Sequence, residues 1–190
     1  MELHSKDRFK KVDITDIAIK KVQRISYKGL TEDQNALMCR LVKMTLLRAL
    51  TENDSNEVAI TIDLEAPDGE QGFTKGDEHS VDIGASPASY HLLRAGMKVV
   101  VIHNHPSTQT LSIEDIALFL RYELIKYIVV VTNQGTVHYL MKDEGFDFSA
   151  AERLRLDCCA DLTKDSPVKD FYNAALDFLA HCSEVGLYYR

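Results

Sequence analysis

The sequence predicts an α/β fold in which a single mixed β-sheet is flanked by helices, with extra helices at both ends of the chain. Segments with the alternating or continuously apolar character of strands occupy the middle of the sequence, and segments with helical periodicity lie between and around them. The 190 residues, 45% of them hydrophobic, are enough to bury one core. We therefore expect a core at residues 51–145, an N-terminal helical extension at 1–50 and a C-terminal helical extension at 146–190, all in one compact unit.

The N-terminal extension is expected to contain two helices, one over residues 13–25 and a longer one that begins at Thr31. Thr31 and Gln34 form a capping-box pattern. Apolar positions then recur at helical spacing and make a wide face, formed by Leu37, Met38, Leu41, Val42, Thr45 and Leu46. This second helix should be well buried.

The core begins with two strands and a helix. Residues 58–63 alternate with the period of a strand, and Glu57 stands at its first step. After a loop rich in glycine and acidic residues (68–77), a second strand is expected near residues 81–83. Ser86 followed by a proline then predicts the start of a helix that ends at Gly96.

The remaining core segments complete the sheet. Residues 97–102 form a valine-rich apolar run, which is typical of a strand buried on both faces, and this run leads directly into His103. An amphipathic helix over residues 113–124 follows, and then strands over 127–132 and 136–141 with a turn between them. From Glu57 to Met141 the expected order is β-β-α-β-α-β-β.

The C-terminal extension is expected to hold two further helices. Ser149 with Glu152 predicts the cap of the first, and Ser166 with Pro167 predicts the start of the second.

Composition argues against several classes of function. The net charge of −7, without a basic block, disfavours nucleic-acid binding. The four cysteines form no CxxC pair and suggest neither a zinc knuckle nor a disulfide framework, which favours a reducing cytoplasm. The segment MELHSKDRFKK lacks the apolar core of a signal peptide, and no apolar run is long enough to span a membrane.

The chemistry is concentrated between His103 and Asp115. In an extended strand end, His103 and His105 point to the same face and can reach one ion. Ser112 begins a helix whose first turn carries Asp115, so that this carboxylate projects back toward the preceding loop. Two imidazoles and a carboxylate leave one tetrahedral position open for water, which is typical of catalytic zinc and unlike the all-oxygen sites of calcium or magnesium.

These residues resemble the metal motif of the JAB/MPN (JAMM) metalloprotease family, in which an upstream Glu precedes H-x-H, about seven residues and S-x-x-D. The HNHPS segment resembles the bacterial branches, which include RadC-like proteins and JAB domains of phage and toxin systems. Here six residues separate His105 from Ser112, one fewer than in the usual pattern. The resemblance covers roughly residues 50 to 145 and implies a JAB/MPN-like fold, with a layout similar to that of cytidine deaminases.

The resemblance also implies a mechanism. His103, His105 and Asp115 would hold Zn²⁺, Glu57 would act as the general base toward the metal's water, and Ser112 would hydrogen-bond the oxyanion. The substrate would be a protein or peptide, with an extended or ubiquitin-like tail as one option, cleaved at a peptide or isopeptide bond. A homodimer stays open as an assembly. Three other acidic residues compete with Glu57 for the role of base, namely Glu65, Glu70 and Glu78.

Two other functions stay open. The shortened loop favours a non-catalytic MPN-like module that binds a protein partner, and HNHPS alone favours a RadC-like link to DNA metabolism. A zinc deaminase is excluded, because it requires H-x-E and P-C-x-x-C, and neither occurs. Among the other histidines, His79 and His91 are candidates for the wall of a substrate groove.

Overall fold

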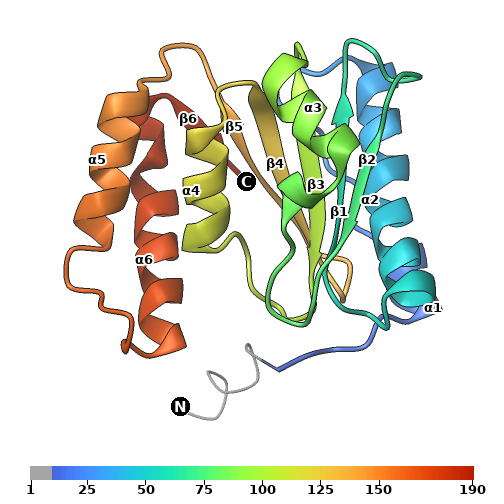
Figure 1. Cartoon of the computed structure of the whole chain (residues 1–190), viewed down its shortest axis with the longest axis horizontal. Helices are drawn as coiled ribbons and strands as arrows, with labels where there is room; N and C mark the ends of the chain where they lie inside the picture. Colours follow the sequence, from blue (N-terminus) through green and yellow to red (C-terminus); the bar gives the residue numbers. More distant parts are fainter. Residues whose placement is uncertain (1–9) are drawn as a thin grey trace.

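The computed structural model describes residues 10–190, and Figure 1 shows their arrangement. Residues 1–9, which include most of the segment tested above for a signal peptide, lie outside the described residues. Within residues 10–190, six strands form one mixed sheet in the order β2-β1-β3-β4-β5-β6. The pairing of β3 with β4 is parallel, and the other neighbours are antiparallel. The predicted α/β class with a single mixed sheet is confirmed.

The strands run from one edge of the sheet to the other with well-defined bounds. They are β1 (Val58–Asp63), β2 (Gly72–Lys75), β3 (Val99–His105), β4 (Ile125–Thr132), β5 (Val137–Lys142) and β6 (Leu187–Tyr189). The helices are α1 (Asp16–Lys20), α2 (Glu32–Glu52), α3 (Pro87–Ala95), α4 (Ile113–Arg121), α5 (Phe148–Cys158) and α6 (Val168–His181). Two short 3₁₀ turns, η2 (Ile83–Ala85) and η3 (Cys182–Val185), complete the described elements.

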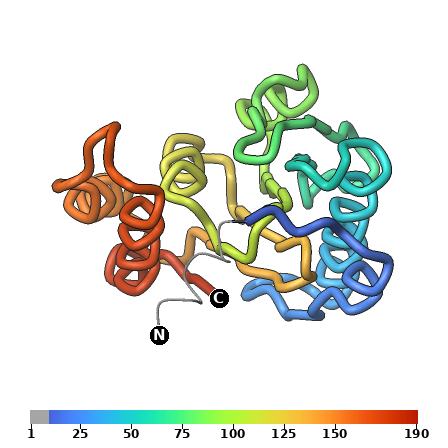
Figure 2. The backbone as a smooth tube through the Cα atoms, turned by 90° about the horizontal axis from the view of Figure 1, so that it is seen from below, coloured from blue at the N-terminus to red at the C-terminus, as the bar shows by residue number. Residues whose placement is uncertain are grey.

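The sheet has a hydrophobic core on each face. Alternate residues of β3 serve the two cores: Val99 and Val101 pack with α4, α5 and α6, whereas Val100 and Ile102 pack with α2. Figure 1 shows α4, α5 and α6 together at the left, and Figure 2, seen from below, places α2 across the sheet from α3 and α4. All seven residues of β3 are buried, as the valine-rich run predicts.

The capping signals locate most helix starts. Thr31 and Gln34 form the expected capping box of α2, and Ser86 caps α3, with a proline in its first turn and Gly96 at its end. The predicted cap at Ser149 is wrong, because the side chain of Asp147 accepts the hydrogen bond from Ala150 N and α5 begins at Phe148. The cap of α6 is Pro167, and the Ser166 hydroxyl accepts a hydrogen bond from Thr163 N instead.

Two strands differ from expectation. The predicted strand near residues 81–83 is wrong, because the side chain of Asp82 accepts a hydrogen bond from Gly84 N and starts a 3₁₀ turn. The strand that pairs with β1 lies earlier, at Gly72–Lys75, inside the segment predicted as a loop. The C-terminal extension also adds β6, which pairs with β5 at the sheet edge. No helix among residues 10–190 is long and apolar enough to cross a membrane.

Candidate metal centre

The strand β3 delivers two imidazoles to one face of the sheet. His103 and His105 continue the side of Val99 and Val101, the face covered by α3 and α4, because side chains two residues apart in a strand point the same way. Both rings are buried. Their Nε2 atoms lie 3.1 Å apart. The alternation expected from H-x-H is therefore present.

The helix α4 adds a carboxylate to the pair. Asp115 Oδ1 lies 3.0 Å from His103 Nε2, and Asp115 Oδ2 lies 3.3 Å from His105 Nε2. Three ligands held at about 2.0 to 2.2 Å in a tetrahedral arrangement are separated from one another by roughly 3.3 Å. The mutual spacing of these atoms is therefore close to three corners of a zinc tetrahedron, and the group could hold a metal ion.

The chain turn before α4 fixes the direction of Asp115. Ser112 is the N-cap, and its hydroxyl accepts a hydrogen bond from Asp115 N at 3.0 Å. In return, Asp115 Oδ2 accepts hydrogen bonds from Ser112 N at 2.7 Å and from the Ser112 hydroxyl at 2.8 Å. This capping box uses both residues twice. Ser112 therefore orients the carboxylate that faces the histidines.

The electrostatics of the cluster favour a negative Asp115. Burial alone would raise the pKa of Asp115, but the charge of His103 and hydrogen bonds from His103 and His105 lower this pKa well below its usual value. For His105, burial lowers the pKa and the hydrogen bond and charge of Asp115 raise it, with a net rise to about 9. A backbone hydrogen bond to Gln109 also contributes to that rise and orients the ring.

Glu57 lies beside the histidines. It immediately precedes β1, whose Ala59 is the register partner of His103, so the same register continued places Glu57 across from His105. Glu57 is 7% exposed. Burial raises its pKa to about 8, with the charge of His105 acting against this rise and the charge of Asp115 adding to it.

The other acidic candidates for the base lie elsewhere. Glu65 pairs with Lys98 and Glu70 pairs with the exposed His91. Glu78 borders the same groove as Glu57, but it is exposed. Among these four carboxylates, Glu57 is the one that is buried beside the imidazoles.

A groove of about 440 Å³ opens onto the cluster. Glu57, His105, Ser112 and Asp115 border it, whereas His103 does not. Of the two histidines proposed for a groove wall, His79 borders it and His91 does not. The polar end of the groove therefore reaches the base and two of the three candidate ligands.

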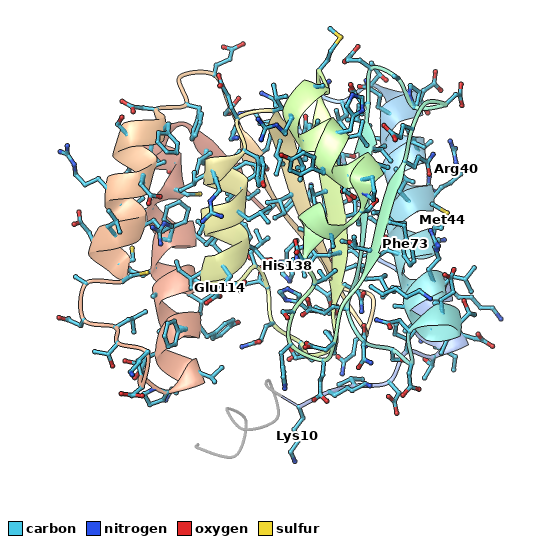
Figure 3. All side chains as sticks on the ribbon, viewed as in Figure 1. Lys10, Arg40, Met44, Phe73, Glu114 and His138 are labelled. Carbon is cyan, nitrogen blue, oxygen red and sulfur yellow. The ribbon has the colours of Figure 1, made fainter. Side chains whose placement is uncertain are left out.

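The walls of the groove come from distant parts of the chain. One wall is formed by the segment before α3, with Val81 and Ile83, and the other by the first turns of α4 and α6, with Ile113 and Phe171. Figure 3 labels Glu114, which borders the groove from the lower end of α4. The contribution of α6 could not be inferred from the sequence, because it depends on how the C-terminal extension packs against α4.

No protein-family model, curated protein or solved structure matches the chain. The site is therefore described by its own geometry.

Two buried asparagines beside the ligands were not singled out by the sequence analysis. Asn104 lies between the two histidines and Asn133 follows β4; both are fully buried. Asn104 Nδ2 donates to Asn133 Oδ1 at 2.8 Å, and Asn133 N donates to the carbonyl oxygen of His105 at 2.9 Å. A polar side chain that alternates into the buried α2 face of a strand was the available signal, since burying an amide is costly unless it is hydrogen-bonded.

Proposed function

We propose that this protein is a zinc-dependent metallohydrolase of the JAMM type that cleaves a peptide or isopeptide bond in a protein or peptide substrate. The proposal rests above all on one observation. The candidate ligand atoms of His103, His105 and Asp115 lie at 3.0 to 3.3 Å from one another, and a buried glutamate lies beside them at the end of an open groove.

The donor set suits zinc better than other common metals. Imidazole nitrogens favour zinc and other transition metals over calcium and magnesium, which prefer all-oxygen sites. Three protein ligands are the number found in catalytic zinc sites, whereas structural sites use four. When bound, zinc would polarise a carbonyl group and acidify a water molecule.

The protein's own groups would handle the proton and the substrate. Glu57 would accept a proton at its carboxylate and pass it to the leaving amine, a role suited to a buried carboxyl whose pKa is raised toward neutrality. Asp115 would remain negative and bind through its carboxylate. The hydroxyl hydrogen of Ser112 is donated to Asp115 Oδ2, so its role at an oxyanion requires that hydroxyl to turn toward the groove.

The groove supports a substrate larger than a water-sized molecule. Its volume of about 440 Å³ and its apolar walls suit an extended segment with an apolar side chain next to the cleaved bond. A peptide or isopeptide fits this shape and the hydrolytic groups at its polar end.

Zinc content and peptide cleavage test the proposal together. Protein purified without chelator should contain about one zinc per chain, and His103→Ala should lose it. His91→Ala is a matched control, because His91 pairs with Glu70 at the surface and does not border the groove. A library of peptides from a digested proteome, incubated with zinc-loaded protein and analysed by mass spectrometry, should show new termini that Glu57→Gln no longer produces.

The outcomes separate the candidate functions. Equal, negligible zinc in wild type and His103→Ala contradicts the metal site. Stoichiometric zinc without new peptide termini contradicts hydrolysis and favours the non-catalytic binding module. Tight, salt-sensitive binding of a DNA duplex would instead favour the RadC-like link to DNA metabolism.

A further inference from the structure

We propose that Asn104 is a positioning residue that fixes Glu57 relative to the two histidines. This inference rests on the proposed function, because it assigns Asn104 a role in the same site. It concerns the face of β3 opposite the groove, where Asn104 lies between the candidate ligands in sequence but does not point toward them.

The side chain of Asn104 holds the chain on both sides of Glu57. Its Oδ1 accepts a hydrogen bond from Val58 N at 2.8 Å, and its Nδ2 donates to the carbonyl oxygen of Asn56 at 3.2 Å. The ladder between β1 and β3 ends at the pair Ala59 and His103. Beyond that pair, the Asn104 amide takes the place of a backbone partner exactly where the base begins.

The same amide is tied to the ligand strand through Asn133. The second Nδ2 hydrogen bond of Asn104 goes to Asn133 Oδ1, while Asn133 Nδ2 donates to the carbonyl oxygens of Ser55 and Val12. Each NH₂ group therefore makes two hydrogen bonds and each amide oxygen accepts one. A buried polar network that is fully satisfied in this way specifies one arrangement of the chain segments that it joins.

The segment before Glu57 needs such a restraint. Asp54 and Ser55 adopt positive φ angles of 50° and 60°, a region that costs non-glycine residues roughly 1 to 3 kcal/mol each and persists only where surrounding contacts enforce it. Asn133 binds the carbonyl oxygen of Ser55, and Lys11 Nζ binds that of Asp54. The two asparagines thus hold a strained turn so that Glu57 emerges from it in one position.

The backbone of Glu57 itself is also held, which limits the role to position. Glu57 N donates to the Asp77 carbonyl oxygen, and the Glu57 carbonyl oxygen accepts from Gly76 N and from Asn53 Nδ2. These contacts tie Glu57 to β2 and to the end of α2. Asn104 provides the hydrogen bonds that tie the segment to β3, the strand that carries both histidines.

Hydrogen exchange in the metal-free protein gives the first test. In Asn104→Ala the Val58 amide loses its acceptor, so its protection should fall at least roughly tenfold relative to the Ile62 amide of the same variant. Asn104→Ser, which differs from the alanine variant by one hydroxyl, should restore part of this protection. An unchanged ratio of Val58 to Ile62 protection in Asn104→Ala overturns the proposal.

Cobalt-loaded protein gives a second readout that needs no substrate. Asn104→Ala should bind one Co²⁺ per chain and reproduce the change in the visible spectrum caused by Glu57→Gln. Val131→Ala is the matched control, because Val131 is the register partner of Asn104 on β4 and truncation there opens the same core without touching the segment around Glu57. A wild-type spectrum for Asn104→Ala, together with an altered one for Glu57→Gln, overturns the positioning role.

Turnover separates this inference from the proposed function. On the peptide that wild type cleaves fastest in the library, Asn104→Ala should lower kcat roughly ten- to hundredfold with little change in KM, because a small misplacement of a reacting group has effects of this size. Val131→Ala should keep the wild-type kcat. Wild-type kcat in Asn104→Ala overturns the inference alone, whereas absence of cleavage by wild type contradicts the proposed function and leaves the exchange and cobalt experiments to decide the role of Asn104.

Discussion

The hydroxyl of Ser112 donates a hydrogen bond to Asp115 Oδ2 at 2.8 Å, and its oxygen accepts one from Asp115 N at 3.0 Å. One residue thus caps α4 and orients a candidate metal ligand. The S-x-x-D spacing has a structural reason, which is the capping box, and a chemical consequence, which is the direction of the carboxylate.

Ser112→Ala should therefore weaken zinc binding as well as α4. We expect a loss of about 1 kcal/mol of stability from the missing cap and roughly a 10- to 100-fold weaker zinc affinity from the missing partner of Asp115. Competition with a chromophoric chelator measures the affinity, and Ser112→Thr should retain most of it. If Ser112 acts only at an oxyanion, zinc affinity in Ser112→Ala stays at the wild-type value and only turnover falls.

Zinc should stabilise the folded protein. At zinc concentrations about a thousand times the dissociation constant, binding to the folded state alone adds about 4 kcal/mol, which corresponds to a rise of roughly 10 °C in Tm for a chain of this size. Thermal unfolding with zinc and with excess chelator measures the difference. Asp115→Asn should reduce the difference, and a Tm that is equal in both conditions for wild type argues against a metal at these residues.

The tyrosines beneath α2 should make the protein sensitive to alkali. Burial raises the pKa of Tyr127 from 10.0 to about 12 and raises that of Tyr27 further in the same direction. Because the folded state holds these protons more tightly than the unfolded state, their contribution is complete below pH 10 and is lost as the pH rises toward 12.

Urea unfolding at pH 9, 10 and 11 checks this effect. The free energy of unfolding of wild type should fall across this range. Tyr127→Phe should lose less over the same range, although it starts lower at pH 9, since Tyr127 donates a hydrogen bond to the Lys28 carbonyl oxygen at 2.6 Å. Parallel curves for the two proteins would mean that Tyr127 does not contribute.

The first residue of α6 should influence which peptides are cleaved. Val168 is 66% exposed and borders the groove, so Val168→Asp should disfavour substrates with an apolar residue beside the cleaved bond by roughly tenfold with little effect on folding. Phe148→Asp is the matched control, since Phe148 is the exposed first residue of α5 and does not border the groove. The peptide library described above gives the preference of each variant. An unchanged preference in Val168→Asp would exclude α6 from substrate recognition.

Local signals in the sequence were enough to predict the parts of the fold that short-range chemistry determines. The valine-rich run gave a strand that is buried on both faces, and capping residues located α2 and α3. The convergence of His103, His105 and Asp115 could be expected because strand alternation and a capping box each fix a direction.

The remaining features depend on contacts between distant segments. The strand β2 is four residues long and was placed wrongly near residues 81–83, where a local side-chain cap by Asp82 prevents a strand. The three residues of β6 form a strand only because β5 is available as a partner. The groove wall from α6 and the hydrogen bonds of Asn104 likewise join segments far apart in the sequence.

The alternation along β3 has a consequence for engineering. Its odd-numbered side chains face the groove and its even-numbered ones face the core beneath α2, so a single backbone carries both. A designer who repacks the interior around Val100 and Ile102 to obtain a more heat-resistant protein also moves the frame on which the imidazoles are mounted. Selection for durability and selection for rate therefore act on the same seven residues, and neither trait can be tuned there in isolation.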